Sequence, residues 1–427
     1  MINIIEAFGE RSMRGLSREK TQGCRMTREE RYIRRRLRRA RRQAQTFYEC
    51  RRFPIQPKKI VFTTIEGTTG FSCHPKYIAL ELLRRNRETQ MGLDLVWLVD
   101  DMEKQFPAGI RKVRNTLRNR AYELSTAQVW VDNSRKQLEV RKRPGQFYLQ
   151  TWHGMIGFKP IGRMRGASFS RIAYLVSKHD ADMVDAELTD SDWFSRIIPE
   201  GLLYDGPLLK FGAPRCDILH GDRAAARRAV HERFGLSNDA NIILYAPTFR
   251  GGSQGTQREV RKLDCAPDER RLLAALEERF GGDWYLFLRL HPQLVARHME
   301  ASAHGGHIVD VSHVDDVYEI LAGCDALLTD YSSLAFDAVH MRIPIFIYAN
   351  DIDAYERERG KLLWDMDDLP FPWAKTDGGL AAIIHDFDNG TYQETLDRFF
   401  QETQMVIDGR ATERTVDFLL EKMRKLQ

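Results

Sequence analysis

The stretch LLTDYSSLAFDAVHMRIPIFIY, residues 327–348, carries the clearest fold signal in the sequence. An apolar run leads into a polar turn, and a helix-like pattern follows. Pro344 then precedes a second run that is rich in β-branched and aromatic residues. This order predicts a strand, a turn, a helix and a second strand.

Two serines, Ser332 and Ser333, stand where the predicted helix should begin. One interpretation is a plain N-cap, because serine is among the residues preferred at that position. The other is a phosphate site, because a helix start has unpaired N–H groups and a partial positive charge, and serine hydroxyls add donors. The stretch by itself leaves both interpretations open.

The same alternation extends over most of the chain. One series of predicted strands and helices runs from residue 58 to 217, and a second runs from 241 to 348. Within the first series, residues 109–127 have a helix-like pattern and are expected to form one helix. Strands that alternate with helices predict parallel sheets covered by helices.

We therefore expect an α/β protein with two Rossmann-like domains and a cleft between them, since 427 residues exceed one ordinary domain. The expected parts are a basic amphipathic N-terminal extension over residues 1–55, an N-terminal Rossmann-like domain over 56–222, a C-terminal Rossmann-like domain over 223–400 and a C-terminal helix over 401–427.

Bulk properties exclude several classes of protein. No segment approaches the ~20 continuous apolar residues needed to span a membrane. The first residues lack the pattern of a signal peptide. None of the six cysteines forms a C-x-x-C pair, and the histidines between residues 298 and 313 match no metal-ligand spacing. We expect a cytoplasmic protein that binds no metal.

A basic segment, RYIRRRLRRARR, occupies residues 31–42 and contains eight arginines. An apolar stripe with helical spacing accompanies them: Ile33, Leu37, Ala40, Ala44 and Phe47. Such a helix is typical of a segment that binds an anionic membrane surface, which is the partner we expect. The alternative is a solvated helix packed on the body of the protein. Nucleic acid is less favoured, because no nucleic-acid-binding motif accompanies the arginines.

Four polar clusters follow predicted strands. Ligands of open α/β sheets bind beyond the carboxyl ends of the strands, so this shared placement indicates a ligand site. The clusters are Trp152-His153-Gly154, Thr248-Phe249-Arg250, Arg289-Leu290-His291-Pro292 and Asp330-Tyr331-Ser332-Ser333.

Three side chains of these clusters suit proton transfer or phosphate binding. His153 precedes a glycine that lets a substrate approach closely, so this histidine could be a general base. His291 could donate to a phosphate oxygen, and Arg250 could hold a phosphate with its planar fork. Each has a structural alternative, which is a histidine satisfied by backbone carbonyls or an arginine in a surface salt bridge.

Six segments occur in a fixed order between residues 58 and 420: TWHG, GAPRCD, YAPTFR, RLHP, TDYSSLAFD and DGRATERTVDFLL. Together they resemble the CDP-glycerol glycerophosphotransferase family, which includes teichoic acid primases and polymerases and related capsule enzymes. The resemblance implies a GT-B-like fold. It also implies that the second domain holds most of the donor nucleotide and that the first faces the acceptor.

The resemblance implies a catalytic role for the histidine of the Trp-His-Gly motif, which here is His153. Trp152, Gly154 and Lys159 would lie on the acceptor side. The sequence departs from the family here, because the motif continues as MIGFKPIGR with the single Lys159 in place of paired lysines. The identity of the acceptor is therefore left open.

On the donor side, the resemblance implies that His291 serves the donor phosphates, and we expect it to be the second catalytic residue beside His153. We expect Arg250 and Asp330 to bind the donor as well. Ser332 and Ser333 would hold the diphosphate at the helix start, which favours phosphate binding over a plain cap.

We expect an enzyme that transfers a polyol phosphate, foremost glycerol phosphate, from a CDP-polyol to a hydroxyl of a glycan or lipid-linked acceptor. CMP would leave, and the product would be a teichoic acid or capsule-type polymer made at the inner face of the cell membrane. No cofactor besides the donor is implied. One alternative is a GT-B glycosyltransferase that uses a nucleotide sugar, since fold does not fix function. The other is a non-enzymatic protein that binds polyanions.

Overall fold

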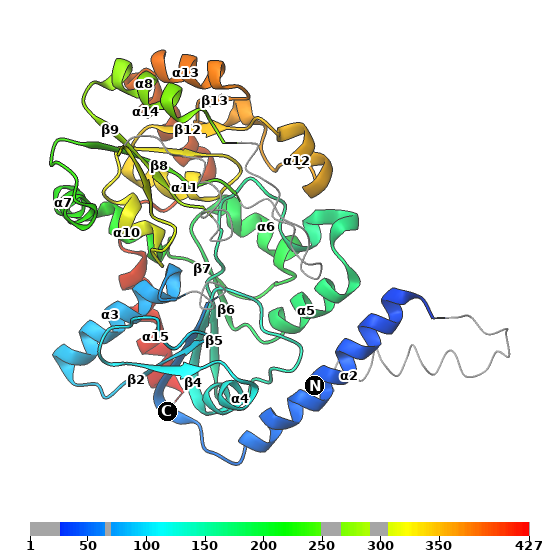
Figure 1. Cartoon of the computed structure of the whole chain (residues 1–427). Helices are drawn as coiled ribbons and strands as arrows, with labels where there is room; N and C mark the ends of the chain where they lie inside the picture. Colours follow the sequence, from blue (N-terminus) through cyan, green and yellow to red (C-terminus); the bar gives the residue numbers. More distant parts are fainter. Residues whose placement is uncertain (1–25, 65–69, 249–265, 291–305, 427) are drawn as a thin grey trace.

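The structure, a computed structural model, describes residues 26–64, 70–248, 266–290 and 306–426. It contains two parallel sheets, and the first lies below the second in Figure 1. The first sheet and the helices that cover it are called the first domain below, and the second sheet with its helices is called the second domain.

The first sheet has seven strands in the order β3-β2-β1-β4-β5-β6-β7. Its strands are β1 Gln56–Thr63, β2 Asp94–Val99, β3 Ile110–Arg114, β4 Ala127–Asp132, β5 Phe147–Gln150, β6 Ala186–Thr189 and β7 Leu208–Lys210. The associated helices are α3 Cys73–Thr89, α4 Leu117–Thr126, the 3-10 helix η2 Gly162–Ser168, α5 Arg171–Ala181 and α6 Asp192–Leu202.

The second sheet has six strands in the order β10-β9-β8-β11-β12-β13. Its strands are β8 Asn241–Tyr245, β9 Trp284–Leu288, β10 Ile308–Asp310, β11 Ala326–Thr329, β12 Ile345–Tyr348 and β13 Trp373–Ala374. The helical elements are α7 Arg223–Phe234, α8 Glu269–Phe280, α10 Val317–Leu321, α11 Leu334–Ala338, η4 Val339–Met341, α12 Ile352–Arg359, η5 Met366–Asp368, α13 Asp377–His385 and α14 Asn389–Thr403.

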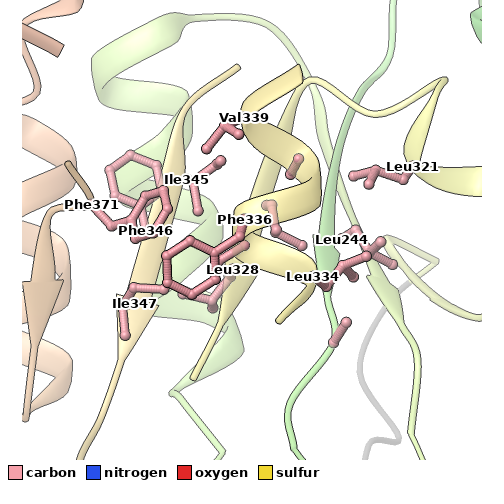
Figure 2. Packing of buried hydrophobic residues seen from close by; sticks show 14 of the residues in the cluster. Leu244, Leu321, Leu328, Leu334, Phe336, Val339, Ile345, Phe346, Ile347 and Phe371 are labelled. Carbon is pink, nitrogen blue, oxygen red and sulfur yellow. The ribbon is translucent and has the colours of Figure 1, made fainter. Parts of the chain in front are cut away.

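The opening stretch forms β11, a turn, α11, η4 and β12, as the sequence predicted. Its strands are completely buried and, apart from Thr329, consist of apolar or aromatic residues, as expected for the centre of a parallel sheet. Leu334 and Phe336 project from α11 into the cluster that contains Leu244, Leu328 and Phe346 (Figure 2). This packing fixes the short helix on the sheet and thereby fixes the turn that precedes it.

The expectation of one helix over residues 109–127 is wrong. Residues 110–114 form β3, which pairs with β2 at the edge of the first sheet. The chain then turns, and Thr116 caps α4 by accepting a hydrogen bond from the N–H of Asn119. Pairing with the open edge of β2 outweighs the helix-like pattern of the charged residues, because local propensity is a weak prior.

Two segments connect the domains. The 3-10 helix η3, Pro214–His220, lies between β7 and α7. The last helix, α15 Ala411–Lys425, returns to the first domain, as Figure 1 shows in red. There Val416, Leu419 and Met423 join the core that covers the first sheet.

The basic segment lies within helix α2, Arg28–Cys50, on the outside of the first domain (Figure 1). A capping box at Thr27 and Glu30 starts this helix. Most of its apolar stripe is buried against the body, and Phe47 belongs to a core cluster with Trp130 and Tyr148. The stripe therefore packs on the protein, and the helix presents arginines to solvent.

Candidate active site

Two turns meet where the domains face each other. The first-domain turn, residues 151–154, follows β5, and the second-domain turn, residues 330–333, follows β11. A Cβ atom built on Gly154 would lie 3.3 Å from Oγ of Ser333. One on Gly157 would lie 3.6 Å from Cβ of the same serine. The absence of side chains at these glycines lets the two turns approach closely, so two of the predicted clusters come together.

The first-domain turn is held in an uncommon conformation. Trp152 has a φ of +53°, in the left-handed region that large side chains rarely adopt. Its N–H donates to Oε1 of Gln150 at 3.0 Å, and the guanidinium of Arg135 lies 4.6 Å from the centre of its ring. Strained backbone persists when its surroundings determine it and is common at functional sites.

His153 is oriented by the neighbouring strand. Its Nδ1 lies 2.7 Å from the backbone carbonyl oxygen of Asn133, which follows β4. A carbonyl oxygen only accepts hydrogen bonds, so Nδ1 carries a proton. In the neutral imidazole, the lone pair is then on Nε2, which is the atom that could take a proton from a substrate.

Trp152 borders a small polar cavity. Its polar lining consists of Arg135, Gln150, Trp152, Asp180, Glu187 and Tyr204. Burial raises the pKa of Asp180 to about 7 and raises the pKa of Glu187 well above its ordinary value. Asp180 accepts hydrogen bonds from the hydroxyl of Tyr148 at 3.0 Å and from the N–H of Lys136 at 2.8 Å. These contacts tie the acid to the strand and loop that support the first-domain turn.

The second-domain turn leads into a helix of only five residues, α11. Oγ of Ser332 accepts a long hydrogen bond, 3.4 Å, from the N–H of Leu334. Ser333 occupies the N-cap position but makes no side-chain capping bond. Both serines are half-buried. The plain-cap interpretation therefore does not describe the hydroxyl of Ser333.

Asp330, which was predicted to bind the donor, is buried and holds a neighbouring strand end. Its Oδ1 accepts a hydrogen bond of 2.7 Å from the N–H of Thr248. Thr248 follows β8, so Asp330 joins the loops after two adjacent strands of the second sheet. This contact gives Asp330 a supporting position beside the second-domain turn.

Lys159, which was predicted on the acceptor side, lies against the second domain. Its Nζ is 3.5 Å from Oγ1 of Thr248. The preceding residue, Phe158, is fully buried, and its ring centre is 4.8 Å from that of Phe336 in α11. The carbonyl oxygen of Phe158 accepts from the N–H of Leu363 at 2.8 Å. Burial of Phe158 in the second-domain core carries the lysine to that domain.

Two predicted site residues, Arg250 and His291, lie outside the described residues. The strands that precede them, β8 and β9, are adjacent in the second sheet and end beside β11 and β10. The structure therefore does not test these two predictions.

Sequence reasoning missed Arg215 and His74, which lie close to His153. A hydrogen bond of 2.7 Å runs from Nη1 of Arg215 to the carbonyl oxygen of His153. The N–H of Arg215 donates to Nδ1 of His74 at 3.4 Å. Burial, followed by the charges of Arg215 and His153, holds the pKa of His74 well below its usual range. The available signal was the GAPRCD segment, which contains Arg215.

The described residues contain neither a metal-binding cluster nor a membrane-spanning helix. These residues include no group of three histidine, cysteine, aspartate or glutamate side chains placed to hold a metal ion. Among the same residues, no helix is long and apolar enough to cross a membrane.

The strands of the two parallel sheets end at the first-domain turn, which contains His153, and at the second-domain turn, which contains Ser333. This arrangement is that of a GT-B-like transferase. The chain belongs to the CDP-glycerol:poly(glycerophosphate) glycerophosphotransferase family, whose model matches residues 45–421. The predicted family, fold class and class of enzyme are thereby confirmed.

Named relatives agree with this assignment. A teichoic acid poly(glycerol phosphate) polymerase of Staphylococcus epidermidis is 29% identical over 381 residues, which cover 86% of this chain and 51% of that protein. A polymerase of the same name from Bacillus spizizenii is 27% identical over 377 residues, covering 86% of this chain and 93% of the relative. The chain thus spans about half of the first relative and most of the second.

A solved structure also matches. It is the wall teichoic acid polymerase TagF, in a variant soaked with CDPG. The TM-score is 0.75 and the identity is 26%, and the match covers 91% of this chain and 95% of that one.

Proposed function

We propose that this protein transfers a polyol phosphate, foremost glycerol phosphate, from a CDP-polyol to a hydroxyl of a glycan or lipid-linked acceptor. The acceptor oxygen attacks the β-phosphorus of the donor and forms a new phosphodiester bond. The bond between that phosphorus and the oxygen of the α-phosphate breaks, and CMP leaves. The proton of the acceptor hydroxyl passes to Nε2 of His153. The polymer made is a teichoic acid or a related capsule-type polymer.

The observation that carries this proposal is the contact between the two turns. Gly154 and Ser333 belong to different domains, yet a Cβ atom added to Gly154 would lie at van der Waals distance from Ser333. A base on one turn and a phosphate held at the other would therefore be within one substrate's reach. Phosphoryl transfer depends mainly on such positioning and on stabilisation of charge.

We propose that the hydroxyls of Ser332 and Ser333 donate to the diphosphate, and that Arg250 and His291 complete the donor site. Lys159 joins this side, since its ammonium group lies beside Thr248, which follows the carboxyl end of β8. Trp152 and Gly154 border the acceptor. The reaction as written needs no cofactor, because nucleophile and leaving group both belong to the substrates.

We further propose that α2 holds the protein at the anionic inner face of the cell membrane. Its arginines at positions 35, 38 and 42 are exposed, whereas Ala40, Ala44 and Phe47 are buried in the protein. The attachment is therefore electrostatic, without insertion of the apolar stripe, and it weakens as salt screens the charges.

The released nucleotide tests the proposed activity. Purified protein is incubated with CDP-glycerol, CDP-ribitol or a UDP-sugar, together with a lipid-linked disaccharide that carries glycerol phosphate. Release of CMP that depends on the acceptor is the expected result. Release of a nucleoside diphosphate from the UDP-sugar, with no CMP from either CDP-polyol, would instead assign a glycosyltransferase.

A further inference from the structure

We propose that Arg215 is a positioning residue that fixes the first-domain turn against the second-domain turn. The inference rests on the proposed function and adds to it a residue that touches neither the donor nor the acceptor. Arg215 lies in η3, the connection between the two domains. It is 4% exposed, so its charge is almost completely removed from water.

The guanidinium of Arg215 bridges the domains. Nη1 donates to the carbonyl oxygen of His153 at 2.7 Å, and Nη2 donates to Oδ2 of Asp337 at 2.8 Å. His153 belongs to the first-domain turn, and Asp337 belongs to α11 of the second domain. The planar fork of arginine can serve two diverging acceptors at once, which the single ammonium of lysine cannot do with the same geometry.

Asp337 links Arg215 to the second-domain turn. It follows Ser333 by four residues, so both lie on one side of the short helix. Its carboxylate is itself held in place, because Oδ2 accepts from the hydroxyl of Tyr318 at 2.7 Å. The thiol of Cys216 donates to Oδ1 at 3.3 Å. A shift of α11 would therefore break several bonds together.

The contacts form a closed ring. One path leads from His153 along the backbone to Gly154, which lies so near Ser333 that a Cβ atom added to the glycine would be 3.3 Å from Oγ of the serine. The other leads from the carbonyl of His153 through Arg215 to Asp337 and back along α11 to the same serine. Two independent paths between the same pair of residues fix their separation, and that separation sets the distance between the base and the donor phosphate.

A role in stability alone explains this arrangement less well. Removing two charges from water costs free energy that their attraction often only offsets, so buried ion pairs are weak evidence for stabilisation. An ion pair that fixes the relative position of two catalytic segments can instead be favoured for its effect on the reaction rate. A misplacement of about 1 Å at the reacting atoms can lower the rate about 10²-fold.

The test compares Arg215→Lys and Asp337→Asn with the wild type in the transfer assay with CDP-glycerol. We expect kcat to fall about 10²-fold, whereas the Kd for CDP-glycerol, measured by calorimetry, changes less than about threefold. Arg227→Lys is the matched control. That guanidinium also bridges a carboxylate, Asp325, and a carbonyl, that of Ala240, but both partners belong to the second domain. The kcat of Arg227→Lys should stay near that of the wild type.

Combination with His153→Ala separates positioning from general damage. If Arg215 acts through His153, Arg215→Lys should lower the residual rate of the His153→Ala protein by less than about threefold. Losses that multiply would overturn the inference, as would a kcat above about a tenth of the wild-type value in the single variants. Should Arg215→Lys fail to fold, Asp337→Asn decides the same comparison. A wild-type protein that releases no CMP would contradict the proposed function itself, which is a distinguishable outcome.

Discussion

Nδ1 of His153 and the backbone carbonyl oxygen of Asn133 lie 2.7 Å apart. The two residues follow neighbouring parallel strands, β5 and β4, so the sheet itself sets this distance. The contact requires a proton on Nδ1 and leaves Nε2 as the basic atom of the neutral ring. The orientation of the histidine is thus built into the first domain before any substrate binds.

His153→Ala should lower kcat by at least ~10²-fold, because a general base acts in the transition state. The Kd for CDP-glycerol should change little. Stopped assays for CMP and a calorimetric titration measure the two quantities. His179→Ala is the control, since Nε2 of His179 also lies against a backbone carbonyl, that of Val140, at 3.0 Å. More than about a tenth of the activity remaining in the His153 variant would refute the assignment.

Replacement of both Ser332 and Ser333 by alanine should weaken CDP-glycerol binding by about 1–3 kcal/mol, the value of hydrogen bonds to a charged group. The melting temperature should stay close to that of the wild type. Ser170→Ala provides the contrast, because Oγ of Ser170 caps α5 by accepting from the N–H of Ala173 at 3.3 Å.

The control should show the opposite pattern, a loss of about 1 kcal/mol of stability with unchanged donor affinity. If the double serine variant behaves like Ser170→Ala, the serines serve only the fold.

Asp180 should make stability depend on pH. Burial raises its pKa to about 7 from an ordinary value of 3.8. Between about pH 4 and pH 7, the folded protein holds a proton on this carboxyl that the unfolded chain has lost. The contribution of Asp180 to stability therefore falls as pH rises through that window.

Asparagine at position 180 removes this titration. The free energy of unfolding of Asp180→Asn, minus that of the wild type, should increase from about pH 5 to about pH 8. Asp388→Asn is the control, because hydrogen bonds from Thr391 lower the pKa of Asp388 and its titration lies below this range. A difference for Asp180→Asn that stays constant would mean that the carboxyl is already ionised at pH 5.

Replacing Arg35, Arg38 and Arg42 with glutamine should reduce binding to phosphatidylserine vesicles by about 10²-fold at low salt, since each arginine near such a surface contributes about 1 kcal/mol. The fold should be unaffected, because these side chains are exposed. Deleting α2 would be a poorer test, since loss of a buried phenylalanine such as Phe47 costs about 3–5 kcal/mol.

Co-sedimentation over a range of salt concentrations measures the effect. The same change at three exposed arginines of the second domain, Arg270, Arg357 and Arg398, provides a control with equal net charge. Equal loss in both triple variants would indicate a response to net charge without a contribution from α2 in particular.

The sequence was sufficient for the parts of the fold that depend on local pattern. Apolar strands followed by amphipathic helices, such as residues 327–348, formed the elements that their periodicity predicts. The prediction of a helix at residues 110–114 was wrong, because the strand that they form depends on pairing with β2. Strand β6 and helices α5 and α6 were not anticipated, since their short or irregular patterns, including Pro199 inside α6, give weak signals.

The residues of the candidate site also fall into two groups, those indicated by local sequence pattern and those that depend on how the two domains are placed. His153 and Ser333 were predicted as site residues because each lies in a turn that follows a strand, where α/β ligands bind. Arg215 was missed because its significance depends on the relative position of two domains. The position of Lys159 beside Thr248 could not be predicted for a similar reason, since it depends on the burial of Phe158 against the second domain.

The most direct test of the central claim is the identity of both products of one turnover, determined by phosphorus NMR and mass spectrometry with CDP-glycerol and a glycerol-phosphate acceptor. Attack at the β-phosphorus predicts CMP and an acceptor lengthened by one glycerol phosphate through a phosphodiester. Attack at the α-phosphorus would instead give free glycerol phosphate and a cytidylylated acceptor, and attack at carbon would give CDP. Either of these last two product pairs would contradict the account.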